Sequence, residues 1–410
     1  MNGQRRPAED LAAVGRGMQP AHVRQINQRA VLSLIFLEPG ISNAELARLT
    51  HLAPQTVSSV LDDLGRRHLI RRGEAVRGRR GQPATPVFMN PTGAFAVGAV
   101  IGWRQLEVCL VGIGGETLAR YRRSYAYPDA ATIFVELGAA VRDLVAGLAT
   151  AERARVMGLG LAVPRRLGDP GALVSPPEEQ AGAWAGLDIA RAAAEVSGLR
   201  VAVYPDGTAA CWAERVAQPR PRPPSFVFLL VDTLVAGGIV AENRLWQGGA
   251  GAAAGLGAMR VLDRQGNSRA VHEVASLHAL HQRLAAHGFG PETVTAPAAA
   301  GVVNAWVEEA GFAFAQIVLS TAAVLDYRLA VIDSALPATV TAALVAATAR
   351  QVAAFPGADR RGPRIVAGRL GRSGAAEGAA LLRLYRRFFS RELVHLQGEA
   401  VRAGGLAMGW

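Results

Sequence analysis

A run of small polar residues near residue 55 has the composition of a surface that reads DNA bases. Its members are Pro54, Gln55, Thr56, Ser58 and Ser59. They alternate with apolar residues spaced as on one buried face of a helix, so they fall on the opposite, exposed face. Short polar side chains at the exposed start of a helix can hydrogen-bond base edges in a major groove. We therefore predict that these residues read bases directly.

A second polar run follows, in which arginines alternate with glycines over residues 77–83. Its polar members are Arg77, Arg79, Arg80 and Gln82. Arginine flanked by glycine can lie flat in a narrow minor groove, where the electrostatic potential is most negative. The run predicts a DNA contact, and the alternative is an ordinary solvated charged loop.

The elements that would position both runs form a winged helix-turn-helix. Apolar spacing predicts helices over 22–37, 42–50 and 54–67. Ser42 with Glu45 three residues later is a capping box for the second helix, and Pro54 suits the first turn of the third. Short strands are expected on both sides of the arginine-glycine run, which would then be the wing.

Charge is distributed unevenly along the 410 residues. All 44 basic residues are arginine, which indicates a coding bias, and the formal net charge is +11. Residues 1–90 hold 13 arginines against 7 acidic residues, a higher density of positive charge than in the remaining chain. A module that binds phosphates requires such an excess. Residues 1–20, polar and weakly basic, are expected to form a flexible tail.

Little in the sequence points to a metal, a disulfide or a membrane. Cys109 and Cys211 are too far apart in sequence to make a metal or redox motif. Three histidines at 272, 278 and 281 resemble metal ligands, but a solvated helix face explains them better, so no metal or cofactor is expected. The first twenty residues lack the apolar core of a signal peptide. The apolar stretches 226–241 and 312–332 are interrupted by charged residues. A cytoplasmic protein without a membrane contact is expected.

From residue 94 onward, strand and helix patterns alternate, which predicts an α/β fold. Two glycine-rich regions, near 94–115 and 226–257, suggest two related lobes. Strands are expected over 94–127, 156–164, 199–205 and 226–248, and helices over 131–150, 188–197, 271–287, 297–325, 337–354 and 374–390.

The whole layout resembles the ROK family (repressors, open reading frames and kinases) in its regulator form. The most specific motifs are the helix-turn-helix at 44–70 and the stretch 78–91, which ends in Asn90-Pro91. The resemblance implies a winged helix-turn-helix over 21–90 and a two-lobed, actin-like (sugar kinase/ribonuclease H-like) domain for effector sensing and dimerisation over 91–410. It also implies a homodimer or tetramer on a pseudo-palindromic operator in double-stranded DNA.

The second domain departs from the family in its chemistry. The family's kinases carry Asp-x-Gly-Gly-Thr, and the matching residues here run from Val100 to Arg104 with Trp103 at a glycine position. Without that aspartate, phosphoryl transfer is not expected, so the chain is predicted not to be an enzyme. Gly255 and Ala258 stand where the family has a sugar-binding glutamate and a histidine. The zinc cysteines are missing from 263–276, so zinc of that type cannot form.

Three residues remain as candidate effector contacts by this resemblance: Glu178, Trp184 and Asp206. Asp206 keeps the family's catalytic carboxylate position, although it could also cap a helix. The leading hypothesis is a sequence-specific transcription regulator, a repressor of carbohydrate metabolism with a sugar-like effector. The alternatives are an active sugar kinase with a DNA-binding domain, and a DNA-binding dimer that senses nothing.

Overall fold

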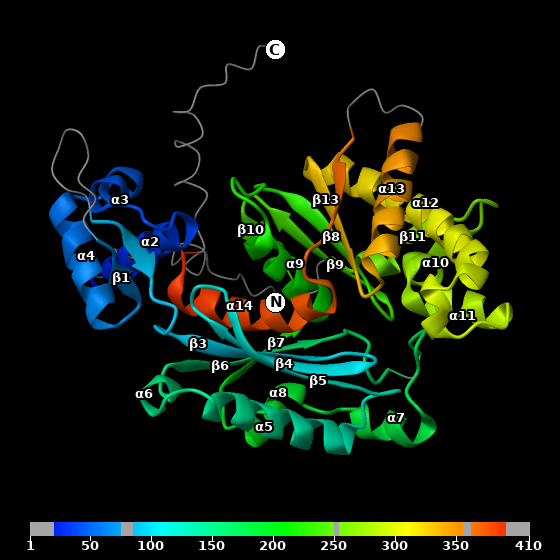
Figure 1. Ribbon diagram of the computed structural model, residues 1–410, viewed down its shortest axis with the longest axis horizontal. Helices are drawn as coiled ribbons and strands as arrows, with labels where there is room; N and C mark the ends of the chain where they lie inside the picture. Colours follow the sequence, from blue (N-terminus) through cyan, green and yellow to red (C-terminus); the bar gives the residue numbers. More distant parts are fainter. Residues whose placement is uncertain (1–19, 75–84, 170, 250–253, 356–361, 391–410) are drawn as a thin grey trace, which may run out of the picture. The chain divides into compact units, whose positions relative to one another are not determined.

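The computed structural model describes residues 20–74, 85–169, 171–249, 254–355 and 362–390 (Figure 1). The chain divides into two compact units, Met1–Asn90 with Phe388–Trp410, and Pro91–Arg387. The predicted tail over residues 1–20 falls almost wholly outside the described residues, as do the four wing residues Arg77, Arg79, Arg80 and Gln82.

The described residues of the first unit form three helices and a two-stranded antiparallel sheet, as predicted. They are α2 (Pro20–Leu37), α3 (Asn43–Thr50), α4 (Pro54–Arg66), β1 (Ile70–Arg72) and β2 (Val87–Met89). The core collects one apolar stripe from each helix, because burying those stripes together removes them from water. Its fully or almost fully buried members include Val31, Leu32, Ile35, Leu46, Val57, Leu61 and Leu64.

The end of the chain differs from the expected domain division, in which 91–410 formed one domain. Residues 388–390 cluster with the first unit. The ring of Phe389 packs against Phe36 of α2 with centroids 5.0 Å apart. The Ser390 backbone N–H donates to the Ser33 hydroxyl at 2.9 Å. A pair of aromatic side chains thus joins residues that are about 350 positions apart in sequence.

The second unit contains two five-stranded sheets of the same design, one in each lobe (Figure 1). In each, the third, second, first, fourth and fifth strands lie side by side, with an antiparallel meander followed by parallel strands. The repeated order bears out the expectation of two related lobes. The first sheet comprises β3 (Phe95–Ile101), β4 (Gln105–Gly112), β5 (Thr117–Ser124), β6 (Val156–Val163) and β7 (Val201–Pro205). The second comprises β8 (Phe226–Val231), β9 (Val235–Ala241), β10 (Arg244–Leu245), β13 (Leu329–Ser334) and β14 (Arg364–Ala367).

Helices cover these sheets, and short elements complete the second lobe. In the first half of the unit they are α5 (Ala130–Ala146), α6 (Thr150–Arg153), α7 (Glu178–Trp184), α8 (Ile189–Ser197) and α9 (Asp206–Ala217). In the second half they are α10 (Val271–Ala275), α11 (Leu277–Ala286), α12 (Ala300–Leu325), α13 (Ala338–Ala354) and α14 (Gly374–Phe388). The short elements are the strands β11 (Arg260–Leu262) and β12 (Ser268–Ala270) and the 3-10 turns η1 (Leu256–Ala258), η2 (Pro291–Thr295), η3 (Pro297–Ala299) and η4 (Gly371–Ser373).

Close packing fixes α14 against the first sheet. A Cβ at Gly98 of β3 would lie 2.0 Å from the Ala376 carbonyl oxygen, and one at Gly160 of β6 would lie 2.0 Å from that of Ala379. Only glycine permits this approach of helix backbone to strand. Below the sheet, α5 and α8 pack on each other and cover the opposite face (Figure 1).

One helix among the described residues, Pro297–Leu325, is long and apolar enough to cross a membrane by length and composition. Half of that window is buried inside the protein. Trp306 and Phe314 of α12 are completely buried in the core of the second lobe. This helix therefore has the position of a core helix.

Candidate DNA interface and ligand pocket

Helix α4 presents a polar surface opposite a fully packed one. Its buried residues are Val57, Val60, Leu61 and Leu64, the four that the sequence pattern assigned to the core. On the other side, Pro54, Gln55 and Ser59 are exposed, and Thr56 and Ser58 are half-buried. We call Gln55, Thr56, Ser58 and Ser59 the reading face of α4.

Hydrogen bonds at the start of α3 cap this helix and join it to α4. The Ser42 hydroxyl accepts from the Glu45 N–H at 3.2 Å, and the Ser42 N–H donates to the Glu45 carboxylate at 3.0 Å, so the capping box is formed. These bonds from Ser42 lower the pKa of Glu45. Asn43 donates from its amide to the Ser58 hydroxyl at 2.8 Å. Ser58 therefore positions the two helices, which leaves Gln55, Thr56 and Ser59 as the more available polar side chains.

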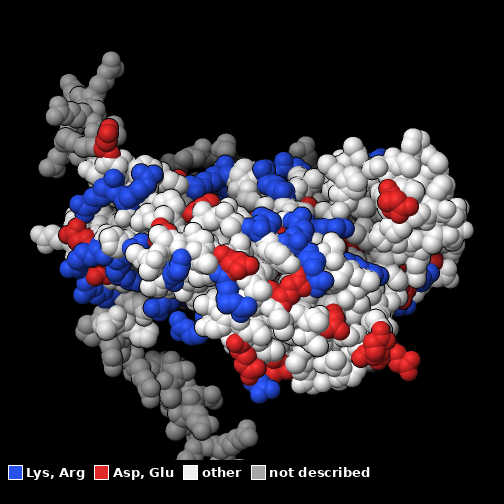
Figure 2. All heavy atoms as spheres, turned by 60° about the horizontal axis from the view of Figure 1, so that its bottom comes forward, with Lys and Arg blue, Asp and Glu red and all other residues white. Residues whose placement is uncertain are grey.

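The far end of α4 is anchored by a carboxylate. Asp63 accepts a hydrogen bond from the Gln28 amide at 2.6 Å, and it lies within 4 Å of the guanidinium groups of Arg24, Arg66 and Arg67. These contacts tie α4 to α2 and surround the acid with positive charge. Figure 2 shows blue side chains gathered on this unit, at the left of the view.

The base of the wing is a regular antiparallel ladder. Ile70 pairs with Met89 and Arg72 with Val87. The Gly73 N–H donates to the Pro86 carbonyl at 2.8 Å, which continues the pairing toward the arginine-glycine run. Residues 75–84, which include the whole arginine-glycine run, lie outside the described residues, so its minor-groove contacts stay a prediction.

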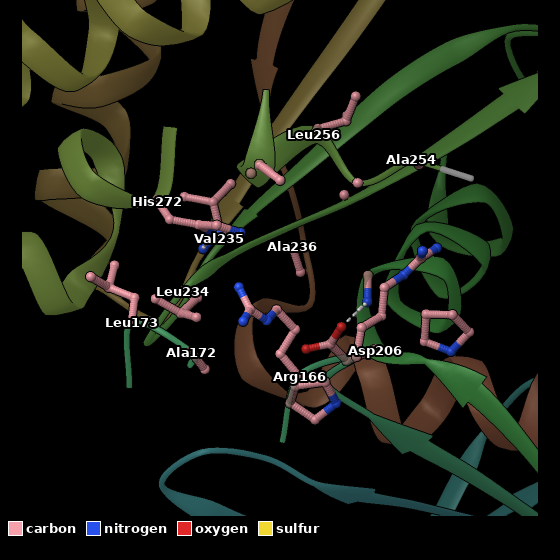
Figure 3. Close-up of a pocket in the computed structure, with 18 of the residues that line it drawn as sticks. Arg166, Ala172, Leu173, Asp206, Leu234, Val235, Ala236, Ala254, Leu256 and His272 are labelled. Atoms are coloured by element: carbon pink, nitrogen blue, oxygen red, sulfur yellow. Dashed lines mark hydrogen bonds between the residues drawn. The ribbon is translucent and has the colours of Figure 1, made fainter. Parts of the chain in front are cut away.

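A cavity of about 170 Å³ lies between the two lobes of the second unit (Figure 3). The first sheet contributes residues at the ends of its strands: Trp103 after β3, Pro164, Arg165 and Arg166 after β6, and Pro205 at the end of β7 with Asp206 and Gly207 after it. Because β3, β6 and β7 are parallel, their carboxyl ends meet at one edge. Ligands bind at such edges in open α/β sheets.

The second lobe closes the cavity with small and apolar residues. The β8–β9 hairpin, the η1 region and α10 contribute Leu234, Val235, Ala236, Gly237, Ala254, Gly255, Leu256, Gly257, Ala258 and His272, and Ala172 and Leu173 of the first lobe complete the wall. In Figure 3, Arg166 and Asp206 point toward the cavity from below, opposite His272 and Leu256. We call this space the interlobe cavity.

Asp206 has an unusual electrostatic environment. Burial raises the pKa of its carboxyl to about 6, and the nearby Asp232 raises it further. The Gly207 N–H, which donates to the Asp206 carboxylate at 2.7 Å, and the charge of Arg165 oppose this rise. Near neutral pH the group is therefore mainly an acceptor that gains a proton readily.

His272 is held as a neutral ring. Its Nδ1 accepts from the Val235 N–H at 3.2 Å, which leaves the proton on Nε2. Burial, with help from the charge of Arg166, lowers its pKa to about 4. The ring lies so close to Gly257 that a Cβ there would be 2.2 Å from it. His272 can therefore donate a hydrogen bond without carrying charge.

Trp103 occupies the turn after β3, where the family resemblance would place the phosphate-binding glycines. Its indole is 6% exposed and packs with Ala172 and Val174. The Tyr127 ring lies 6.4 Å away at an edge-to-face angle. Val100, which the family resemblance matches to the kinase aspartate, is buried in the sheet. The turn is filled by side chains that offer no acceptor for Mg²⁺.

The three candidate effector residues lie in different surroundings. Asp206 lines the interlobe cavity, but Glu178 and Trp184 are not among the lining residues. Glu178 is exposed at the start of α7. Trp184 is buried in the core of the first lobe beside Phe134, and its indole N–H donates to the Pro128 carbonyl at 3.1 Å. Arg165 and Arg166 were not predicted as cavity residues, although they follow a strongly apolar strand, which is a usable signal. His272 was considered only as a possible metal ligand and lies instead in the cavity wall.

The segment 263–276 replaces a zinc loop with a hydrogen-bonded turn. The Asp263 carboxylate accepts from the N–H groups of Gln265 and Asn267, at 2.9 and 2.8 Å. The Asn267 side-chain amide, which donates to the same carboxylate at 3.1 Å, lowers the pKa of Asp263 most, and the two backbone bonds lower it further. The segment has no cysteine, so the thiolates that such a zinc site needs are absent. Across the described ranges, no group of three or more histidine, cysteine or acidic residues could hold a metal.

A winged helix-turn-helix joined to two lobes with repeated sheets defines a DNA-binding protein with a sugar-kinase-like second domain. The chain belongs to the ROK family, whose model matches residues 96–385. A model described as winged helix-turn-helix DNA-binding matches residues 24–71. The domain composition is that of a ROK transcriptional regulator.

Relatives agree with this assignment. The chain is 26% identical over 371 residues to the uncharacterized protein y4fQ of Sinorhizobium fredii (strain NBRC 101917 / NGR234), covering 89% of this chain and 92% of that one. It is 23% identical over 245 residues to the xylose repressor of Bacillus subtilis (strain 168), covering 58% of this chain and 61% of the repressor.

Solved structures share the fold. A ROK family transcriptional regulator, a homolog of the E. coli MLC protein, superposes with a TM-score of 0.66 at 20% identity, covering 92% of this chain and all of that one. A ROK family glucokinase from Streptomyces griseus, in complex with glucose and AMPPNP, superposes with a TM-score of 0.57 at 21% identity, covering 70% and 99%. Regulators and kinases therefore share the architecture, and the residues of the site must separate them.

Proposed function

We propose that this protein is a repressor that binds a pseudo-palindromic operator as a homodimer in the cytoplasm. Each protomer places α4 in a major groove, so that Gln55, Thr56 and Ser59 meet base edges. The observation that carries the proposal is the reading face, exposed at the start of a helix whose other side is completely buried. A two-fold protein matches a two-fold operator. The xylose repressor among its relatives supports the sign of the regulation.

The test begins with genome-wide mapping of the DNA that the full chain binds. The affinity of wild type and Gln55→Ala is then measured on the best site and on a scrambled duplex. One good base contact discriminates by about 1–3 kcal/mol, so specific binding should weaken roughly tenfold or more while scrambled binding stays unchanged. Gln25→Ala, an exposed glutamine on α2, is the matched control. Equal losses on both duplexes would overturn base readout by α4.

The interlobe cavity is the proposed effector site. Its volume of about 170 Å³ is smaller than the roughly 300–1,000 Å³ of pockets for drug-sized ligands, so the cavity suits a ligand as small as a sugar. A ligand there contacts both lobes, so it can change the protein's preference between two conformations and thereby the affinity for operator. If the domain serves dimerisation alone, no small molecule will change operator affinity.

The same domain is proposed not to transfer phosphate. Trp103 fills the turn after β3 that would have to cradle a nucleotide, and Val100, buried in β3, offers no carboxylate for its Mg²⁺. A coupled assay for ADP release over a panel of sugars should therefore stay at background. ATP turnover that disappears in Asp206→Asn would instead assign kinase activity to the cavity.

A further inference from the structure

We infer that three arginines around a buried tyrosine form a second ligand site, which binds a phosphate group. The four residues are Arg200, Tyr204, Arg383 and Arg386, and we call them the Tyr204 cluster. They lie on the first lobe, where α14 passes the edge strand β7, and they are not among the lining residues of the interlobe cavity. The site is therefore separate from the proposed effector site and from the reading face of α4.

Close contacts bring two guanidinium groups to the tyrosine. The Arg386 guanidinium lies 4.9 Å from the centre of the Tyr204 ring. Its Nη2 donates to the Gln247 side-chain oxygen at 3.4 Å. The Arg383 guanidinium packs on the backbone of β6, where a Cβ at Gly158 would lie 2.9 Å from its Nε. Glycine at position 158 therefore leaves the room that this guanidinium occupies.

The cluster carries positive charge that no nearby acid balances. Among the residues that the structure describes, no carboxylate lies within 4 Å of any of its three arginines. Burial lowers the pKa of Arg383, and the charges of Arg200 and Arg386 lower it further, against the effect of the Tyr204 phenol. Like charges held this close repel one another, and an anion that binds between them removes the repulsion. A phosphate group suits three guanidinium groups, because each of them can pair with two of its oxygens.

Two buried hydrogen-bond donors of the cluster lack an acceptor. They are the Tyr204 hydroxyl and the Arg383 Nε, and neither has a hydrogen-bond partner within the described parts of the chain. The Tyr204 side chain is 2% exposed, and a buried donor that is left unpaired lowers stability. The cluster therefore needs an acceptor as well as a negative charge, and an oxygen of a bound phosphate supplies both.

The depth of the cluster favours a small ligand over the phosphate backbone of DNA. Arg200 and Arg386 are exposed, whereas Arg383 is half-buried and the Tyr204 ring lies beneath Arg386. An exposed arginine changes its rotamer rapidly, so a small ion can pass Arg386 and reach the two donors behind it. A DNA duplex is wide and stiff and meets only groups at the surface.

Isothermal titration of the full-length protein with sodium phosphate tests the inference. Sodium chloride at equal ionic strength is the reference, and we expect saturable binding of phosphate and none of chloride. Methyl phosphate, in which one oxygen carries a substituent, distinguishes the two sources of the group. Affinity equal to that of phosphate would assign a phosphorylated small molecule as the ligand, and affinity at least tenfold lower would assign the free ion.

Three variants locate the binding. Arg383→Gln should weaken phosphate binding at least tenfold, and Arg386→Gln should weaken it at an exposed position that the fold tolerates. Tyr204→Phe removes only the hydroxyl. It should weaken phosphate binding and leave the midpoint of chemical denaturation unchanged or higher, because the described chain gives this hydroxyl no partner to lose. Arg191→Gln on α8, an exposed arginine in an i,i+4 pair with Glu195, is the matched control.

Phosphate that binds no better than chloride would overturn the inference, and so would phosphate binding that survives both Arg383→Gln and Tyr204→Phe. If phosphate does not bind and Arg386→Gln weakens binding to operator and scrambled duplex equally, the arginines contact the DNA backbone and the small-ligand site is wrong. The titration contains no DNA, so its failure leaves the DNA-binding proposal unchanged.

Discussion

The reading face of α4 and the interlobe cavity solve the problem of recognition in opposite ways. The reading face lies within five consecutive positions of one helix, and a single buried stripe orients all of it. The cavity draws its lining from residues between 103 and 272, supplied by both lobes. The first surface needs only the small core that buries one side of α4, whereas the second forms only when two separate sheets have folded and packed together.

The difference has a physical consequence for how each can change. A substitution on an exposed helix face alters recognition with little effect on folding. The cavity wall is shared with the core, as the packing of Trp103 and the contact of His272 with Gly257 show. A new ligand specificity there must be compatible with packing, which favours changes at exposed positions such as Arg165 and Arg166.

The largest expected effect tests whether the two units depend on separate cores. Leu64→Ala should cost the first unit about 2–5 kcal/mol in free energy of unfolding, because it empties a completely packed site. Hydrogen exchange should rise in α2, α3 and α4 and stay unchanged in β3 and β6. Leu344→Ala in α13, where the side chain is fully buried, should produce the reverse pattern. Equal increases in both units for either variant would show a shared core.

Substitutions at two serines separate an effect on stability from an effect on DNA recognition. Ser42→Ala removes the capping box of α3 and should lower the stability of the first unit by about 1 kcal/mol, as measured by chemical denaturation. Ser59→Ala, on the exposed reading face, should change stability by less than about 0.5 kcal/mol but weaken operator binding. If Ser59→Ala destabilised the fold as much as Ser42→Ala, the separation would fail.

The smallest expected effect concerns the pH dependence of Asp206. Its folded pKa of about 6 lies above the value near 3.9 of an unfolded aspartate, so the wild type loses stability as pH rises from about 4 to 7. Asp206→Asn should match the wild type at pH 4 and be more stable at pH 8. We expect a difference on the order of 1 kcal/mol, because the group is partly exposed.

Denaturation curves at both pH values measure this difference. Asp143→Asn, at an exposed aspartate on α5, is the matched control for the loss of a carboxylate. A variant that is less stable than the wild type at pH 8 would contradict the raised pKa of Asp206.

Local sequence patterns predict nearly all of the described elements of the first unit. Helical spacing assigned Val57, Val60, Leu61 and Leu64 to the buried face of α4, and the Ser42–Glu45 pattern placed the start of α3. Such features depend on residues three or four positions apart, which is the range over which a helix repeats. The same local logic predicted the strands of both hairpin regions and their alternation with helices.

Two features of the second unit depend on packing between distant parts of the chain and were not predicted from local patterns. The central strand β13 (Leu329–Ser334) went unpredicted because its apolar run follows that of α12 almost without a break. The expected helix over 271–287 is divided at Ser276, whose hydroxyl accepts from the Ala279 N–H and starts α11 anew.

The lining of the interlobe cavity also depends on packing between distant parts of the chain. Whether an aromatic side chain lines a cavity or fills a core depends on which neighbours the sheet brings, and this placed Trp184 in the core and Trp103 at the cavity. Arg166 and His272, more than a hundred positions apart, come to one cavity because parallel strand ends share an edge and the second lobe closes over it. The spacing of residues along one helix or strand does not predict this contact between distant residues, because the packing of two separate sheets brings them together.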